Sequence, residues 1–211
     1  MKDKVGEIIH YLEELYPDAR CELNYQKDYE LLIATVLSAQ CRDARVNEVT
    51  KELWKIYDLE SLSLASIDDV EKIIHSLGNG RKKSKYIVEI AKKLVFECGG
   101  RVPNDKEYLE SLPGVGRKTC NVVLSNIYNV DAIAVDTHVE RVSKRLRLAQ
   151  RSDDVLTVEK KLMRVFPKEK WSKLHHQLVL FGRYQCKAIK PECEECRLKE
   201  FCCYFKQKKK V

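Results

Sequence analysis

The sequence contains little glycine and proline, with only 8 and 5 of its 211 residues, and almost no alternation of apolar and polar residues. A β-rich fold needs many turn residues and period-2 strands, so both shortages argue against one. No apolar run approaches the roughly 20 residues of a membrane helix; LLIATVL at 31–37 is the longest. The charged, amphipathic N-terminus lacks the pattern of a signal peptide, so we expect a cytoplasmic protein.

Apolar residues instead recur at helical spacing along most of the chain. The segment 66–78 begins at a cap-like Ser66, carries one apolar face and stops at Gly78. Comparable helices are predicted over 28–38, 46–57, 83–98, 117–128, 136–148, 153–166 and 168–182. The predicted fold class is therefore all-α.

The charge and cysteine content restrict the class of partner and cofactor. Lys and Arg number 39 against 32 Asp and Glu, and this net charge of +7 mildly favours a polyanionic partner. Nine cysteines are numerous, but their odd number and the lack of a secretion signal argue against a disulfide framework. A metal site is the better interpretation.

Four cysteines near the C-terminus have the spacing of one metal centre. Cys186, Cys193, Cys196 and Cys202 follow the pattern C-x6-C-x2-C-x5-C. Four thiolates this close can surround tetrahedral zinc or a [4Fe-4S] cluster, although zinc sites more often use two close pairs. Cys203 is interpreted as a spectator, and small core side chains are expected at Cys21, Cys41, Cys98 and Cys120.

A glycine turn precedes the predicted helix at 117–128. In LPGVGRKTCNVVL, Gly114 and Gly116 permit backbone angles that other residues avoid, and the following helix N-terminus offers free N–H groups to an anion. Lys118 lies in the first turn, where the positive end of the helix dipole disfavours a second positive charge. This position destabilises an ammonium group and therefore requires an explanation.

Four motifs together carry a resemblance to a known family. LPGVGRKT, IAVDTHVERV, HHQLVLFGRYQC and the cysteine spacing resemble the endonuclease III family of DNA glycosylases, over nearly the whole chain. The resemblance implies a helix-hairpin-helix at the glycine turn and a [4Fe-4S] cluster on the cysteines. It also implies two helical lobes: a barrel at 22–130, and a cluster lobe that combines 1–21 with 131–211.

The resemblance gives Lys118 a chemical role. In such enzymes a lysine amine attacks the sugar C1′, expels the damaged base and forms a Schiff base, and β-elimination then breaks the strand. The amine must be neutral, and a helix dipole and a partly dry pocket both favour that form. Asp136, in AVDTHV, matches the catalytic aspartate, although an aspartate there is also a good N-cap. Without the resemblance, Lys118 would be interpreted as a solvated lysine.

The resemblance also suggests residues that contact DNA. Gln40, in LSAQ, corresponds to the residue that fills the gap left by a flipped base; a helix C-terminal polar residue is the alternative. Amides between Gly114 and Gly116 are expected to hold a phosphate. Lys187 and Lys190 lie between the first two cluster cysteines, where they form either a basic finger on the DNA or solvated loop lysines.

The sequence departs from the family pattern at one DNA-facing segment. LGNGRKKSKYI places Asn79 and Gly80 where the family usually has an apolar or aromatic pair, so an apolar wedge is missing or altered. Arg42 and Arg81 are candidates to compensate through phosphate or orphan-base contacts. Asn79 and Arg81 are therefore among the expected DNA contacts, and we expect lesion choice to depend on this segment.

The predicted function is that of a monomeric, nucleoid-associated DNA glycosylase/AP lyase acting on oxidised pyrimidines in duplex DNA. One alternative keeps the fold but changes the lesion to pyrimidine dimers or mismatched bases. Another is a non-catalytic DNA-binding module whose cysteines hold zinc. His138 and the pair His175 and His176 are interpreted as packing or hydrogen-bonding residues, because the cluster already has four ligands.

Overall fold

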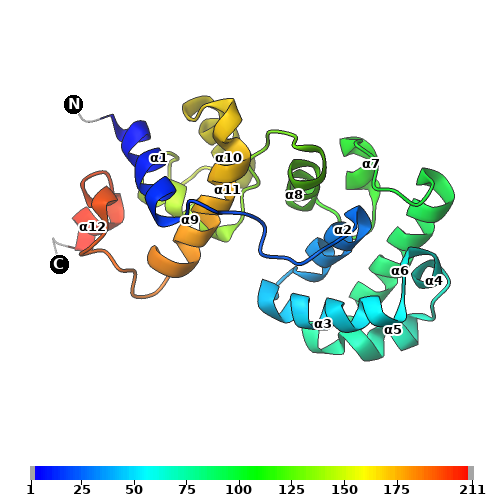
Figure 1. The fold of residues 1–211 in the computed structure, drawn as a ribbon. Helices are drawn as coiled ribbons and strands as arrows, with labels where there is room; N and C mark the ends of the chain where they lie inside the picture. Colours follow the sequence, from blue (N-terminus) through cyan, green and yellow to red (C-terminus); the bar gives the residue numbers. More distant parts are fainter. Residues whose placement is uncertain (1–2, 209–211) are drawn as a thin grey trace. The chain divides into compact units, whose positions relative to one another are not determined.

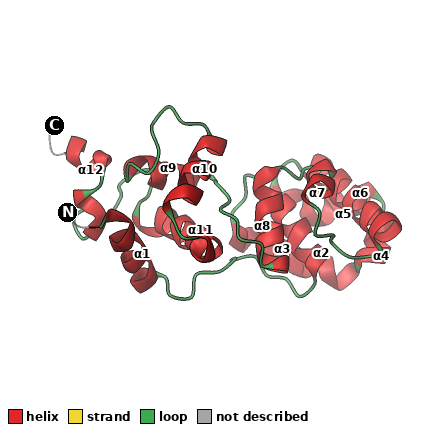
Figure 2. Ribbon diagram, turned by 90° about the horizontal axis from the view of Figure 1, so that it is seen from above, coloured by secondary structure: helices red, strands yellow, loops and turns green. Residues whose placement is uncertain are grey.

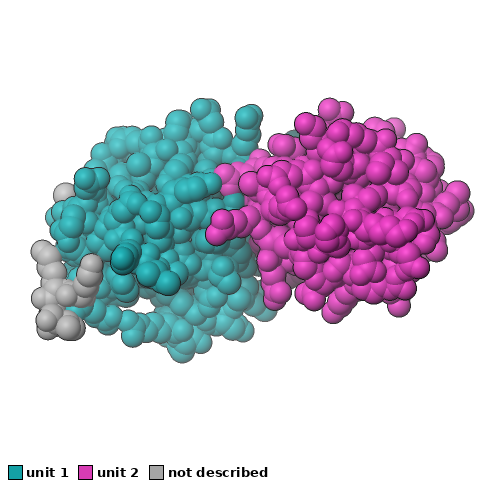
Figure 3. All heavy atoms as spheres, turned by 90° about the horizontal axis from the view of Figure 1, so that it is seen from below, with its two compact units in different colours: residues 1–20, 129–211 teal, residues 21–128 magenta. Residues whose placement is uncertain are grey.

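The computed structural model describes residues 3–208, and all regular secondary structure in that range is helical (Figures 1 and 2). The predicted all-α fold class is confirmed. Among the described residues, no helix combines the length and apolar character needed to cross a membrane. The chain forms two compact units (Figure 3): unit 1 contains residues 1–20 and 129–211, and unit 2 contains residues 21–128.

Unit 2 is a cluster of helices around α2. Its elements are α2 (Asp28–Leu37), α3 (Asp43–Ile56), α4 (Leu59–Ser63), α5 (Ile67–Ile74), the 3₁₀ turn η1 (His75–Leu77), α6 (Gly80–Cys98), α7 (Lys106–Ser111) and α8 (Arg117–Tyr128). Every residue of α2 from Tyr29 to Leu37 is buried, as its apolar sequence requires. Helices α6 and α8 pack on α2, and the short helices α4 and α5 pack on α6.

Unit 1 joins the N-terminal helix to the C-terminal part of the chain. Its elements are α1 (Lys4–Leu15), α9 (Thr137–Arg145), α10 (Val155–Val165), η2 (Lys168–Lys170), α11 (Trp171–Leu180), the π-helical turn η3 (Phe181–Gln185), η4 (Arg197–Glu200) and α12 (Cys203–Lys208). Leu12, Val142 and Leu178 are fully buried in one core. Helix α1 packs on α11 and η4, so residues distant in sequence complete this unit.

Aspartate side chains cap several helix starts. The N-cap residues Asp58, Asp105, Asp136 and Asp154 each accept a hydrogen bond from a backbone N–H in the first helical turn. Ser66 occupies the N-cap position of α5 as predicted, but its side chain makes no capping hydrogen bond. Asp68 and Asp69 lie in that first turn instead, where negative charge complements the helix dipole.

Candidate functional site

Backbone conformation and close packing together require glycine at position 114, in the turn between α7 and α8. Gly114 has a φ of 78°, in the left-handed region, and an added Cβ would lie 2.5 Å from Cδ2 of Tyr86 and 3.2 Å from Cγ1 of Val36. At Gly116, by contrast, such a Cβ would meet no heavy atom of the described residues within 4 Å, apart from the glycine itself and its two neighbours in the chain. Gly114 is therefore explained by packing inside unit 2, whereas at Gly116 the missing side chain leaves space for an approaching partner.

Lys118 is the second residue of α8, directly after this turn. The helix begins at Arg117, and Cys120 N–H donates to the Gly116 carbonyl at 2.9 Å, so the turn continues into the helix without a break. The Lys118 side chain is exposed, whereas the resemblance implied a partly dry pocket around it. The first-turn position deduced from the sequence is confirmed, and with it the unfavourable orientation relative to the helix dipole.

Asp136 performs the capping role that the sequence allowed. Its Oδ1 accepts hydrogen bonds from the backbone N–H groups of His138 and Val139, both at 2.8 Å, at the start of α9. Because both bonds go to one oxygen, Oδ2 takes no part in the cap. The carboxylate is half-buried, so it is rigidly held without being sealed from a ligand. Asp136 belongs to unit 1 and Lys118 to unit 2.

Two non-glycine residues among the expected DNA contacts of unit 2 have unusual backbone conformations. Gln40 follows α2 with a φ of 59°, and Asn79 precedes α6 with a φ of 50°. Left-handed residues other than glycine are uncommon and cluster at functional sites, because their conformational cost must be offset by surrounding contacts. Both side chains are exposed. The known tolerance of asparagine for this conformation was the one available signal, and it applies to Asn79 alone.

Arg81 makes ion pairs within unit 2. One guanidinium nitrogen, Nη1, contacts Asp68 and lies 3.3 Å from Glu71 Oε2, both on α5. These carboxylates raise the pKa of Arg81. The side chain is exposed, so a phosphate would compete with two carboxylates for the same donor. Arg42 is exposed at the N-cap of α3, where its side chain makes no capping bond.

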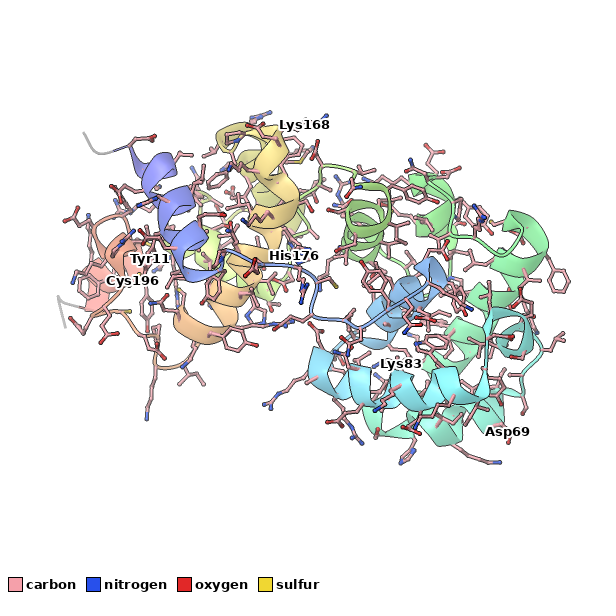
Figure 4. All side chains as sticks on the ribbon, viewed as in Figure 1. Tyr11, Asp69, Lys83, Lys168, His176 and Cys196 are labelled. Atoms are coloured by element: carbon pink, nitrogen blue, oxygen red, sulfur yellow. The ribbon has the colours of Figure 1, made fainter. Side chains whose placement is uncertain are left out.

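The four predicted ligand cysteines lie around one cavity in unit 1, the part of Figure 4 in which Cys196 is labelled. Phe181, Leu146 and Phe205 supply apolar walls. Burial raises the pKa of Cys196 to about 11 and also raises the pKa of Cys202. The described residues contain no group of three or more His, Cys, Asp or Glu side chains close enough together to hold a metal ion. The donor set itself, four soft thiols in an apolar cavity, fits an iron–sulfur cluster or zinc.

Arg145, which sequence reasoning missed, supports the segment after Cys186. Its Nη1 donates to the Lys187 carbonyl at 2.7 Å and to Cys186 Sγ at 3.3 Å, and its Nη2 donates to the Ala188 carbonyl at 3.2 Å. The guanidinium lies 4.0 Å from the ring centroid of Tyr204. Arginines on a helix normally face solvent, so nothing in SKRLRL marks this one as an internal donor.

The predicted basic finger, Lys187 with Lys190, has less available charge than the sequence suggested. Lys187 Nζ donates to Glu192 Oε1 at 2.6 Å, so part of its charge is neutralised within the loop. Lys190 is exposed, with a left-handed φ of 49°. Between them lies Ile189, which is 80% exposed. Lys190 is therefore the stronger candidate for a phosphate contact.

The histidines occupy packing positions, in agreement with their interpretation from sequence. A Cβ added to Gly182 would lie 2.8 Å from His138 Cβ, so α9 and η3 are in close contact there. Burial lowers the pKa of His138. His176 is buried in α11, where burial lowers its pKa to about 4. Neutral, buried imidazoles are typical of a core.

The helical fold and the glycine hairpin define a helix-hairpin-helix protein. Residues 33–168, more than half of the chain, match the family model described as HhH-GPD superfamily base excision DNA repair protein. Among curated proteins, endonuclease III of Bacillus subtilis (strain 168) is 49% identical over 201 residues, covering 95% of this chain and 89% of the relative. Endonuclease III of Escherichia coli (strain K12) is 40% identical over 204 residues, covering 96% of each.

Solved structures agree with the sequence relatives. One is described as a trapped endonuclease III–DNA covalent intermediate in an estranged-adenine complex; it is 46% identical, covers 99% of each chain and has a TM-score of 0.94. Another, a non-covalent endonuclease III–DNA complex, is 45% identical with a TM-score of 0.95, covering 100% of this chain and 99% of the other. The chain therefore belongs to the endonuclease III family of the HhH-GPD superfamily, as its motifs predicted.

Proposed function

We propose that this chain is a bifunctional DNA glycosylase/AP lyase that removes oxidised pyrimidines from duplex DNA in base excision repair. The observation that carries the proposal is the position of Lys118, exposed in the first turn of α8 directly after the Gly114–Gly116 turn. This arrangement puts a primary amine beside main-chain N–H groups suited to a DNA phosphate. The relatives named endonuclease III and the solved endonuclease III–DNA complexes support DNA as the partner.

In the proposed reaction, the Lys118 amine attacks C1′ of an extruded nucleotide. The N–C1′ bond forms as the glycosidic bond breaks, and the base leaves with the bonding electron pair and then takes up a proton. The nitrogen then loses a proton, the C1′–O4′ bond breaks and O4′ takes up a proton, which leaves a protonated Schiff base between Lys118 and C1′. This cation acidifies C2′, loss of a C2′ proton breaks the C3′–O bond, and water finally releases the lysine. The strand is thereby cut on the 3′ side of the lesion.

Asp136 is proposed to support this chemistry as a fixed negative charge. Its cap bonds both use Oδ1, and they fix the orientation of the half-buried carboxylate at the start of α9. A carboxylate held in this way stabilises positive charge that develops on the sugar and assists proton removal from the amine. The capping and catalytic roles therefore use the same rigid side chain.

DNA contacts are proposed for Gln40, Asn79, Arg81, Gly114, Gly116, Lys187 and Lys190. Gln40 and Asn79 are candidates to occupy the space that an extruded base vacates, because both project from left-handed turns. The open space at Gly116 suits close approach of a phosphate. Arg81 contributes only if phosphate displaces Asp68 and Glu71, and Lys187 contributes only if phosphate displaces Glu192.

Cys186, Cys193, Cys196 and Cys202 are proposed to hold a [4Fe-4S] cluster, since all four surround one cavity. When bound, the cluster supplies a covalent cross-link of this loop-rich segment. Because burial favours the protonated thiols, cluster assembly must release protons from Cys196 and Cys202. Iron and acid-labile sulfide analysis of the purified protein tests the assignment, and zinc without iron would contradict it.

The reaction is tested by borohydride trapping on duplexes that carry thymine glycol, uracil or a cyclobutane dimer. Wild-type protein is expected to form a covalent complex and to cut the thymine glycol duplex. Lys118→Ala should abolish trapping and strand cleavage, and Asp136→Asn should slow base release severely. Lys92→Ala, an exposed lysine of α6, is the matched control and should behave as wild type. Wild-type binding without trapping on any duplex would contradict the proposal.

A further inference from the structure

Lys83 is a buried lysine whose charge the proposed chemistry does not use. It lies in the first turn of α6 with only 6% of its surface exposed, at the position labelled in Figure 4. Its neighbours Lys82 and Lys85 are exposed on the same helix. A buried ammonium is costly unless it is hydrogen-bonded, so its partners decide why it is there.

The partners of Lys83 are main-chain carbonyls from two separate segments. Nζ donates to the carbonyls of Leu37 and Ala39, each at 2.9 Å. Its third bond, also 2.9 Å, goes to the carbonyl of Leu77. Leu37 is the last residue of α2, and Leu77 is the last residue of η1. Carbonyl groups at a helix end accept no hydrogen bond from a following helical N–H, and the helix dipole is negative there. Both features favour a cation at this position.

A cysteine completes this cluster. The Cys41 thiol donates to the Leu77 carbonyl, and Lys83 Nζ lies 3.4 Å from its sulfur. Cys41 follows Gln40, so its bond to Leu77 is a second link between the same two segments. From the sequence, Cys41 is expected only to be a small core side chain.

The two linked segments are those that present Gln40 and Asn79. Gln40 follows the Ala39 carbonyl, and Asn79 lies two residues after Leu77. Because one nitrogen binds both carbonyls, their oxygens lie within two hydrogen-bond lengths of each other. The left-handed backbone at Gln40 and Asn79 is thereby held in place from inside unit 2.

We propose that Lys83 is a positioning residue for base extrusion: it joins the Gln40 and Asn79 turns so that both side chains enter the DNA as one preformed unit. This inference rests on the proposed function. Filling the gap with a preformed unit avoids the entropy cost of ordering two turns while the base is being extruded. Lys83 touches neither the reacting sugar nor Lys118 in this role, so it should affect extrusion more than bond chemistry.

The test compares a substrate that needs extrusion with one that does not. Single-turnover base release is measured on a thymine glycol duplex, and β-elimination is measured on an abasic site in single-stranded DNA. Lys83→Met preserves side-chain volume but removes all three carbonyl bonds. It should slow duplex base release by about 10- to 100-fold and change single-strand elimination by less than about threefold.

Two further readouts separate positioning from a loss of stability. A 2-aminopurine opposite the lesion should fluoresce when wild-type protein extrudes the damaged base, and the signal should be weaker with Lys83→Met. Leu94→Ala, a fully buried residue of α6, is the control for lost stability and should retain both the fluorescence and the ratio of the two rates at temperatures where it is folded.

If Lys83→Met does not fold, Cys41→Ala tests the proposal in its place. This variant removes one link and leaves all three lysine bonds, so duplex base release should fall by about two- to fivefold with single-strand elimination unchanged. An equal change in both rates, or no change in either, would overturn the assignment of Lys83. A wild-type protein that traps no DNA would instead overturn the proposed function, so the two failures are distinguishable.

Discussion

The glycine turn of unit 2 and the cysteine loop of unit 1 are both expected to meet DNA, but different forces hold them. The turn at 112–116 is fixed by backbone conformation and by contact of Gly114 with Tyr86 and Val36. The loop after Cys186 is fixed by side-chain donors, above all the guanidinium of Arg145. The first support can be deduced from a glycine pattern, whereas the second depends on a side chain brought in by tertiary packing.

The largest effect is expected from breaking the support of the glycine turn. Gly114→Ala adds a Cβ that meets Tyr86 at 2.5 Å and forces a side chain into a left-handed conformation. We expect a loss of about 2–5 kcal/mol in the free energy of unfolding. Urea denaturation followed by circular dichroism measures it.

Gly116→Ala is the matched control for that turn. Its Cβ meets no described residue other than its two neighbours in the chain, so the free energy of unfolding should change by less than about 1 kcal/mol. Affinity for an abasic-site duplex should nevertheless fall, because the added methyl group occupies space left for phosphate. Equal destabilisation by both substitutions would contradict the distinction between packing at Gly114 and access at Gly116.

The corresponding change in unit 1 is Arg145→Met. It removes the donors to the Lys187 and Ala188 carbonyls and to the Cys186 sulfur while retaining much of the side-chain volume. We expect a loss of about 2–4 kcal/mol, with iron content reduced in the purified protein. Differential scanning calorimetry and iron analysis measure the two effects. Unchanged iron content and unchanged melting would show that the loop does not depend on this side chain.

The sequence predicted helices where the helical spacing of apolar residues continues over several turns and a capping residue or glycine marks a boundary. The helix of 83–98 and the start of α8 at Arg117 are examples, since a glycine marks an end of each. The short helices α4 and α7 were not predicted, because their one or two turns carry too little periodicity. Their N-caps Asp58 and Asp105 were the available signal.

The candidate site was predictable where chemistry is encoded locally. Lys118 after a glycine turn and the cysteine spacing are both readable in one segment. Lys83 was not predictable, because RKKSK presents several equivalent lysines and only packing against α2 and η1 selects one for burial. The same reason explains why Arg145 was missed: its acceptors lie about 40 residues away in the chain.

Acid should destabilise unit 1 through His176. Burial lowers the folded-state pKa to about 4, whereas the unfolded chain has a value near 6.5. The unfolded state therefore binds one more proton between these values, and stability falls as pH drops from about 6.5 towards 4, by roughly 2–3 kcal/mol. Urea denaturation of wild type and His176→Gln at several pH values measures the difference. His10→Gln, at an exposed position of α1, is the control and should follow wild type.

The smallest effect concerns the two loop lysines. Lys190→Ala should lower DNA affinity and reduce the slope of log affinity against log salt by about 1, because a free ammonium replaces one counterion at a phosphate. Lys187→Ala should change the slope less, because Lys187 is paired with Glu192. Titrations at several salt concentrations measure both slopes, and a larger change for Lys187 would reverse this ranking.

The central claim concerns which nitrogen forms the covalent bond to DNA. The most direct measurement is borohydride reduction of the wild-type complex on a thymine glycol duplex, followed by proteolysis and mass spectrometry of the DNA-linked peptide. The account predicts that the reduced sugar adduct is on Lys118. An adduct on the N-terminal amine or on another lysine, with Lys118 unmodified, would contradict it.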